Sequence, residues 1–153
     1  MPDRKAELKV IDGGSAADSQ HIAAEFVGRF KKDRRPLRSI ALTTDSSVLT
    51  CVANDYSYEE IFSRQLNALG RKNDVLVAIT TSGESENIRR ALIQARKMGI
   101  KTIGLLGKKG GTCKDYLDIP LIVPSDTTAR IQEMHIMIGQ MLCGALEVEL
   151  GLL

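Results

Sequence analysis

Short apolar stretches alternate along the chain with amphipathic ones. Five stretches are apolar at nearly every position and rich in Ile, Val and Leu: Leu8–Ile11, Ser39–Thr43, Val75–Ile79, Thr102–Leu106 and Ile119–Val123. Runs of this kind are typical of strands that are buried on both faces. Because helical patterns separate the runs, the alternation of strand and helix predicts an α/β fold with one parallel, doubly wound sheet.

Two stretches have the spacing of amphipathic helices. In Glu84–Met98 apolar residues recur every three or four positions, and Gly99 stands where a left-handed C-terminal cap is expected. Ser57 and Glu60 predict a capping box at the start of another helix. The residues that this helix is expected to bury are Ile61, Phe62, Leu66 and Leu69.

The last segment, from Thr128 to about Leu150, is apolar on most faces of the helix that it predicts. A helix that is hydrophobic nearly all round must be covered on more than one side. A domain of 153 residues covers only part of such a helix. We therefore infer that this helix packs in a subunit interface.

Composition and charge narrow the class of protein. The 153 residues, 43% hydrophobic and 26% charged, fit a single globular domain over 1–153. A net charge of +2 and the absence of Trp argue against a nucleic-acid or membrane-surface binder. No apolar run reaches the about 18 residues of a membrane span, and the N-terminus lacks a signal-peptide core. The widely spaced Cys51, Cys113 and Cys143 indicate reduced thiols in a cytoplasmic protein.

Two strand-to-helix junctions are rich in glycine and hydroxyl groups. The first reads Asp12-Gly13-Gly14-Ser15, and the second reads Thr80-Thr81-Ser82-Gly83-Glu84-Ser85. Each follows a predicted strand and opens a helix, so backbone N–H groups and the positive end of a helix dipole are available there. Glycine permits close approach, and hydroxyls donate to anionic oxygens. The loops predict a phosphate cradle without a lysine, although the same residues could simply cap helices and turn the chain.

A second group of polar residues falls on helices. His21 and Glu25 are four residues apart and share a helix face, where they could bind one metal ion, transfer protons together or form an ordinary surface pair. Gln132 and Gln140, eight apart in the last helix, lie roughly on one side of it. They need polar partners, which an interface could also supply. His135 is offset from both and is expected to be structural.

Two polar stretches are expected to be turns. Asn54 and Asp55 precede the capping Ser57 and suit simple turn chemistry. The basic run Lys31–Arg35 ends at Pro36 and is expected to be solvated.

Longer segments can be compared with a known family. They are Gly13–Phe30, Leu42–Asp55, Thr80–Ser85 and Ala129–Ile136. Together they resemble the phosphoheptose isomerases, a group within the sugar-isomerase (SIS) domain family. The resemblance implies a flavodoxin-like three-layer α/β/α sandwich with a five-stranded parallel sheet and a long C-terminal helix, assembled as a homotetramer with one zinc ion per subunit. The implied reaction converts sedoheptulose 7-phosphate to D-glycero-D-manno-heptose 7-phosphate through an enediol(ate), toward heptose in lipopolysaccharide.

The resemblance also implies roles for individual residues. Those that match substrate and phosphate contacts are Gly13, Gly14, Ser15, Thr80, Thr81, Ser82 and Ser85, with Asp12 beside them, and the Asn-Asp pair Asn54 and Asp55. Those at the metal-ligand positions are His21, Glu25, Gln132 and Gln140. Glu25 and Gln132 would also lie near substrate, and Glu25 would be the base that removes a proton beside the carbonyl.

Three features depart from the family pattern. Gln140 stands where the family usually has a His that acts as metal ligand and general acid, whereas an amide neither titrates near neutrality nor binds zinc well. Asp12 and Glu84 would put negative charge near a bound phosphate. Only nine residues precede Val10, where relatives usually carry additional helices that pack in the tetramer.

Other functions stay open at this point. A SIS-fold protein that binds sugar phosphate without catalysis, like relatives that associate with the replication initiator, is favoured by Gln140. The preserved trio His21, Glu25 and Gln132 disfavours it. An isomerase for another phosphosugar, such as arabinose 5-phosphate, is a third possibility. Such relatives usually carry regulatory domains, for which this chain has no room.

Overall fold

Five parallel strands form the central layer. In the computed structural model, which describes residues 8–12 and 15–153, they are β1 (Leu8–Asp12), β2 (Ser39–Ala41), β3 (Val75–Thr80), β4 (Lys101–Gly107) and β5 (Ile119–Val123). Their spatial order is β2-β1-β3-β4-β5, and every neighbouring pair is parallel. This is the flavodoxin-like order, in which the strand order reverses between β1 and β3. The parallel sheet predicted from the apolar runs is confirmed.

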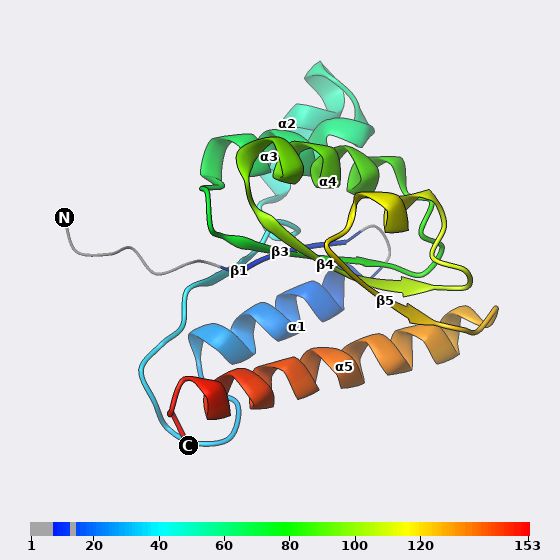
Figure 1. The fold of residues 1–153 in the computed structure, drawn as a ribbon. Coiled ribbons are helices and arrows are strands. Elements are labelled where there is room, and N and C mark those ends of the chain that lie inside the picture. Colours follow the sequence, from blue (N-terminus) through cyan, green and yellow to red (C-terminus); the bar gives the residue numbers. More distant parts are fainter. Residues whose placement is uncertain (1–7, 13–14) are drawn as a thin grey trace.

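Helices cover both faces of the sheet (Figure 1). One face carries α2 (Ser46–Asp55), α3 (Ile61–Leu69) and α4 (Glu86–Met98), and the other carries α1 (Ala16–Val27) and α5 (Thr128–Glu149). Two short 3-10 turns, η1 (Tyr58–Glu60) and η2 (Thr112–Tyr116), precede α3 and β5. The expected layered α/β architecture with a long C-terminal helix is therefore present.

The sheet separates two hydrophobic clusters. Leu76 of β3 faces the layer of α3 and α4, where it joins Leu66 and Leu92. Val77, the next residue of β3, joins the cluster that contains Phe26 of α1. Successive side chains of a strand point to opposite faces, so a strand with helices on both sides is apolar at every position.

The amphipathic spacing of α4 gave an accurate prediction. The helix begins at Glu86, two residues later than the start of the pattern, and ends where expected. Gly99 adopts the left-handed conformation with φ 68°, and its N–H donates to the carbonyls of Ala95 and Arg96. A side chain with a Cβ rarely adopts this conformation, so glycine ends the helix here.

The segment before α3 differs from the prediction. Ser57 makes no capping hydrogen bond through its side chain, so the capping box does not form. Glu60 instead accepts hydrogen bonds from Ser63 and Arg90. The outward position of Leu69, which is 48% exposed, also contradicts its predicted burial.

Helix α2 was not expected from the sequence. Asn54 and Asp55, predicted as turn residues, are its last two residues. Its Ser, Thr and Val residues are weak helix formers, so propensity gave little signal. Asp45 caps the helix by accepting a hydrogen bond from the backbone N–H of Val48 at 3.0 Å.

The basic run after α1 is only partly solvated. Lys31, Lys32, Asp33 and Arg35 are exposed, as predicted. The side chain of Arg34 is 3% exposed, which corrects that prediction, because it forms an ion pair with Glu147 of α5.

The outer face of α5 remains uncovered in one chain. Its exposed apolar side chains are Met134, Met137, Met141, Leu146 and Val148. Packing of this face in a subunit interface stays a prediction. Across the described residues, the helices all fall short of the length and apolar character that crossing a membrane requires.

Candidate functional site

The candidate site lies at the edge of the sheet where β1, β3 and β4 end. β1 and β3 are direct neighbours, with Asp12 opposite Ile79, so these two strands end side by side. In such sheets ligands bind at the carboxyl ends of strands, where the strand order reverses. The predicted contacts Gly13 and Gly14 lie outside the described residues, as does the side chain of Asp12.

Hydroxyl groups connect the two ends of the loop between β3 and α4. The Oγ1 atom of Thr80 lies 3.0 Å from Ser85 Oγ and 3.5 Å from Ser82 Oγ. The backbone N–H of Gly83 donates to Thr80 Oγ1 at 3.3 Å, and that of Glu84 donates to Ser82 Oγ at 3.1 Å. The structure thus brings three of the predicted phosphate contacts together in one organised loop.

The serines that precede α1 and α4 do not cap these helices. Ser15 and Ser85 occupy the N-cap positions, yet neither side chain makes a capping hydrogen bond. Ser15 is 5% exposed, and its hydroxyl makes no hydrogen bond of normal geometry to a described residue, although its interaction with the carboxylate of Asp18 lowers the pKa of that residue. A buried hydroxyl without a well-formed hydrogen bond is costly, so a ligand that accepts a hydrogen bond there would be stabilised. This arrangement favours an anion site over simple helix capping.

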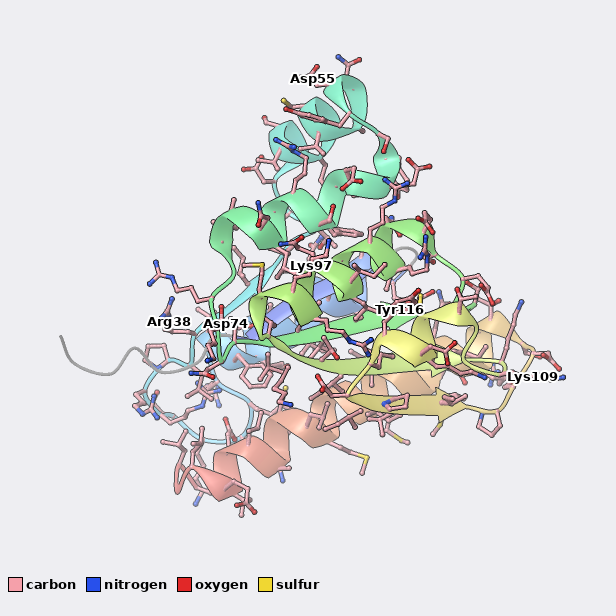
Figure 2. The ribbon with its side chains drawn as sticks, turned by 45° about the horizontal axis from the view of Figure 1, so that its top comes forward. Arg38, Asp55, Asp74, Lys97, Lys109 and Tyr116 are labelled. Carbon is pink, nitrogen blue, oxygen red and sulfur yellow. The ribbon has the colours of Figure 1, made fainter. Side chains whose placement is uncertain are left out.

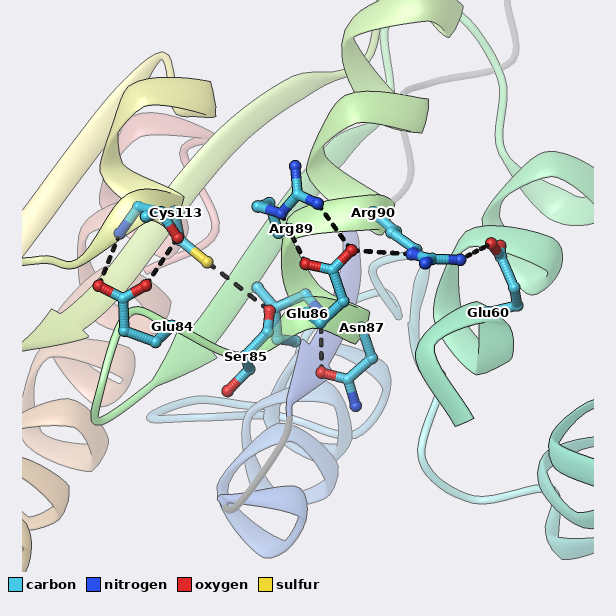
Figure 3. A network of polar contacts seen from close by, with 10 residues as sticks. Glu60, Glu84, Ser85, Glu86, Asn87, Arg89, Arg90 and Cys113 are labelled. Carbon is cyan, nitrogen blue, oxygen red and sulfur yellow. Dashed lines mark hydrogen bonds and ion pairs between the residues drawn. The ribbon is translucent and has the colours of Figure 1, made fainter. Parts of the chain in front are cut away.

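A second segment, residues 110–113, packs against the loop between β3 and α4. Gly83 has a φ of 70°, and a Cβ atom there would lie 2.1 Å from the carbonyl oxygen of Gly110. The carbonyl oxygen of Gly83 accepts a hydrogen bond from the N–H of Cys113 at 2.9 Å. Glu84 turns toward the same segment, where its carboxylate binds Thr112 (Figure 3). Glycine is required at position 83 for both its conformation and this close approach.

Charges at the start of α4 are paired. The Glu86 carboxylate accepts hydrogen bonds from Arg89 and Arg90, and Arg90 also contacts Glu60 of η1 (Figure 3). The hydrogen bonds from the two guanidinium groups lower the pKa of Glu86 to about 2. A carboxylate here is compatible with the helix dipole, and its arginine partners offset its repulsion of a nearby anion.

His21 and Glu25 form the predicted pair on α1. His21 Nε2 lies 3.1 Å from Glu25 Oε1, with the side chains 49% and 23% exposed. His21 is six residues beyond Ser15, which corresponds to about 9 Å along the helix. This separation is comparable with the length of an extended phosphorylated heptose, so one ligand can reach from the serine loops to the pair.

Helices α1 and α5 approach closely beside this pair. A Cβ atom on Gly139 would lie 2.4 Å from Cδ1 of Ile22, so a larger residue there would force the side chain of Ile22 to move. His21 and Gln140 are the chain neighbours of these two residues. Gln140 and His21 therefore each stand next to a residue of this helix crossing.

Gln132 follows a residue of α5 that packs beside the hydroxyl loop. Its neighbour Ile131 packs on Gly107, where a Cβ atom would lie 2.5 Å from Ile131 Cδ1 and 2.3 Å from the carbonyl oxygen of Thr81. The first turn of α5 and the loop after β3 thus meet at the end of β4. This placement suits a residue that contacts a ligand bound between the loops and α1.

His135 and Asp18 face each other between α5 and α1. His135 is completely buried, and burial lowers its pKa, although the Leu106 carbonyl and the charge of Asp18 act in the opposite direction. Burial raises the pKa of Asp18, while the charges of His135 and His21 oppose the increase. A fully buried imidazole cannot reach a ligand in an open site, which supports the predicted structural role of His135.

The predicted Asn-Asp pair lies elsewhere in a single chain. Asn54 and Asp55 are exposed at the end of α2, on the face of the sheet opposite α1 (Figure 2). Asp55 accepts hydrogen bonds from Asn54 Nδ2 at 3.1 Å and from Cys51 Sγ at 3.4 Å. One chain does not bring this pair to the loops, and its contact with substrate stays a prediction.

The available donors fit a zinc ion only in part. Among residues 8–12 and 15–153, no three His, Cys, Asp or Glu side chains gather closely enough to hold a metal. His21 and Glu25 are suitable ligands, but a four-coordinate site needs more. Gln132 and Gln140 would have to complete it, and neutral amides are poor zinc ligands. The donor set of one chain therefore does not fit zinc, and no catalytic step below passes through a metal.

Comparisons with known proteins show the family of this chain. A model of the SIS domain matches residues 12–107. The phosphoheptose isomerase of a Nitratiruptor species is 60% identical over 147 residues, which cover 96% of this chain and 79% of that protein. The phosphoheptose isomerase of Clostridium acetobutylicum is also 60% identical, over 146 residues that cover 95% of this chain and 74% of that protein.

Solved structures give the same result. A phosphoheptose isomerase from Francisella tularensis superposes with a TM-score of 0.87 at 40% identity, covering 91% of this chain and 75% of that one. One from Neisseria gonorrhoeae superposes with a TM-score of 0.88 at 42% identity, covering 94% and 77%. Fold and sequence therefore agree, and the chain belongs to the SIS domain family and, within it, to the phosphoheptose isomerases.

Proposed function

We propose that this protein is an aldose–ketose isomerase that converts sedoheptulose 7-phosphate to D-glycero-D-manno-heptose 7-phosphate. The observation that carries this proposal is the pair of N-cap serines, Ser15 and Ser85, whose side chains do not cap the helices that they precede. Relatives named phosphoheptose isomerase, 60% identical to this chain, support it independently.

The serine loops would hold the phosphate. The hydroxyls of Ser15, Ser82 and Ser85 can donate to its oxygens, together with free backbone N–H groups at the starts of α1 and α4. Negative charge is favoured at helix N-termini. Binding energy at the phosphate then positions the other end of the sugar against α1.

Glu25 would act as the base at that end. It removes a proton from C1 of the ketose, the C–H electron pair forms the C1–C2 double bond of the enediol, and the C2 oxygen gains a proton. Glu25 then returns its proton to C2 while the C1 hydroxyl loses one, which leaves the aldose. His21, 3.1 Å from Glu25, would relay the proton between the two oxygens. Gln140 can donate a hydrogen bond to a developing enediolate but cannot titrate.

A turnover assay tests this proposal. Purified protein is incubated with sedoheptulose 7-phosphate, and aldose formation is followed for the wild type, Glu25→Gln and Gln140→His. We expect slow turnover by the wild type, none by Glu25→Gln and faster turnover by Gln140→His. Sugar-phosphate binding without product from either the wild type or Gln140→His would contradict catalysis and support a non-catalytic SIS-fold binding protein.

We propose that this site binds zinc only weakly. His21 and Glu25 would be the principal ligands, and the amide oxygens of Gln132 and Gln140 are too weak as ligands to complete a firm site. We expect little zinc in the wild type after dialysis and about one ion per subunit in Gln140→His, measured by elemental analysis. Zinc uptake that Glu25→Gln leaves unchanged would contradict this ligand set.

A homotetramer is proposed from the exposed face of α5. Met137 and Met141, 44% and 64% exposed, would be buried between subunits, together with other apolar residues of that face. Light scattering should give the mass of a tetramer for the wild type and a smaller one for Met141→Glu. An unchanged mass in this variant would contradict the interface.

The three free cysteines are consistent with the cytoplasm, where the reaction is proposed to occur.

A further inference from the structure

A buried ion pair joins the loop after α1 to the last turns of α5. Arg34 Nε donates to Glu147 Oε1 at 2.9 Å, and the two side chains are 3% and 1% exposed. Such burial is unusual for charged residues unless each group is fully paired. The other contacts of both residues show what this pair holds in place.

The guanidinium of Arg34 binds the end of α1. Its Nη2 donates to the carbonyl oxygen of Glu25 at 2.7 Å, and its Nη1 donates to those of Phe26 at 2.8 Å and Gly28 at 3.1 Å. The last carbonyls of a helix have no partner within the helix. Arg34 supplies partners through a planar set of donors that no other side chain offers.

Glu147 holds the chain that follows. Its carboxylate accepts hydrogen bonds from the backbone N–H groups of Phe30 at 3.1 Å and Lys31 at 3.2 Å. Burial would raise the pKa of Glu147, but these bonds and the one from Arg34 outweigh it, so the pKa lies below its usual value. The carboxylate is therefore charged and anchors the loop to α5.

The carbonyl of Glu25, which Arg34 binds, belongs to the residue whose side chain is the proposed base. Without Arg34 the carbonyl of Glu25 would lack a partner, and the last turn of α1 would fray. Glu25 would then lose its fixed position relative to His21 and to Gln140 across the contact between α1 and α5. The serine loops lie at the opposite end of α1 and do not touch this ion pair.

We propose that Arg34 is a positioning residue for the isomerase reaction. It fixes the carboxylate of Glu25 by binding the carbonyl of the same residue and by locking the end of α1 onto Glu147 of α5. It does not touch substrate. The inference rests on the proposed function, because it gives Glu25 the role of base.

Steady-state kinetics of full-length Arg34→Met test the proposal. We expect kcat for sedoheptulose 7-phosphate to fall about 100-fold, the size of effect that a 1 Å misplacement causes, with KM changed less than about twofold. Arg34→Lys keeps a charge opposite Glu147 but loses the planar donors, so it should recover thermal stability more fully than kcat. Should Arg34→Met not fold, Arg34→Lys carries the same comparison.

The matched control is Arg96→Met. Arg96 lies in the last turn of α4, where Nη2 donates to the carbonyl of Asp115 at 3.2 Å, so the variant also loses an arginine–carbonyl contact. Its kcat should equal that of the wild type. An equal loss of kcat in both variants would show a general effect on the fold and overturn the proposal.

Amide hydrogen exchange provides a measurement besides activity. The N–H of Gly28 donates to Ala24 at 2.8 Å, and that of Leu37 donates to Phe26 at 2.9 Å. Both should exchange faster in Arg34→Met, while amides of α3 should not change. An active wild type with an unaltered kcat in Arg34→Met would overturn this inference alone, whereas an inactive wild type would overturn the proposed function.

Discussion

The carboxylate of Glu84 accepts two hydrogen bonds from Thr112, one from its backbone N–H at 3.1 Å and one from its hydroxyl at 2.8 Å. The sequence predicts negative charge from Glu84 near a bound phosphate. In the structure the side chain points to the segment behind the loop, and its charge is hydrogen-bonded there. Glu84 therefore supports the loop after β3.

Glu84→Ala should weaken substrate binding. The variant removes two charge-assisted hydrogen bonds from an exposed site, so the hydrogen bonds of Cys113 to the carbonyls of Gly83 and Ser85 would remain to hold the loop. We expect KM for sedoheptulose 7-phosphate to rise about tenfold, which corresponds to about 1.4 kcal/mol, with a smaller change in kcat. Glu149→Ala, at the end of α5, is the control and should leave KM unchanged. A lower KM in Glu84→Ala would mean that repulsion of the phosphate dominates.

Sequence patterns predicted well the features that depend on nearby residues or that repeat with the period of a helix or a strand. β3 is apolar from Val75 to Ile79 because helices cover both of its faces, and α4 has clear three- and four-residue spacing. The His21–Glu25 pair was predictable for the same reason, since residues four apart on a helix share a face. These signals need no knowledge of distant parts of the chain.

The features that were missed depend on partners far along the chain. Arg34 was expected in solvent because its own neighbours are charged, yet its partner Glu147 lies 113 residues away. Thr112, the partner of Glu84, lies 28 residues away. Helix α2 is stabilised by an N-cap and by packing more than by helix propensity, so the amino-acid composition of the segment did not indicate a helix.

The two serine loops should bind phosphate together. Ser15→Ala combined with Ser82→Ala removes one hydroxyl donor from each loop, and hydrogen bonds to charged groups contribute about 1.5–3 kcal/mol each. We expect affinity for the sugar phosphate, measured by calorimetry, to fall at least about 100-fold in the double variant. Ser46→Ala, at the exposed start of α2, is the control. Unaltered affinity in the double variant would exclude the loops as the phosphate site.

The three thiols should differ in reactivity. Burial raises the pKa of Cys113 to about 11 and that of Cys143 to about 12, so neither should react with a thiol reagent in the native protein. Cys51 is exposed and should react, but its hydrogen bond to Asp55 raises its pKa and slows the reaction. We expect one reactive thiol per chain by colorimetric titration and faster labelling in Asp55→Asn. Three equally reactive thiols would contradict the described packing.

The ion pair between Arg34 and Glu147 should make stability depend on pH in acid. The folded-state pKa of Glu147 lies below its ordinary value of 4.5, so its contribution to the free energy of unfolding is fully present above that pH. As the pH falls below 4.5 toward the folded-state value, the unfolded chain binds the proton more readily and the contribution is lost.

Urea denaturation of the wild type and Glu147→Gln at pH 7, 5, 4 and 3 measures this effect. The wild type should be more stable at pH 7, and the difference between the two proteins should shrink steadily between pH 5 and 3. Glu149→Gln is the matched control, because its exposed carboxylate lies in the same turn of α5. A difference that stays constant down to pH 3 would show that Glu147 acts through its shape and not through its charge.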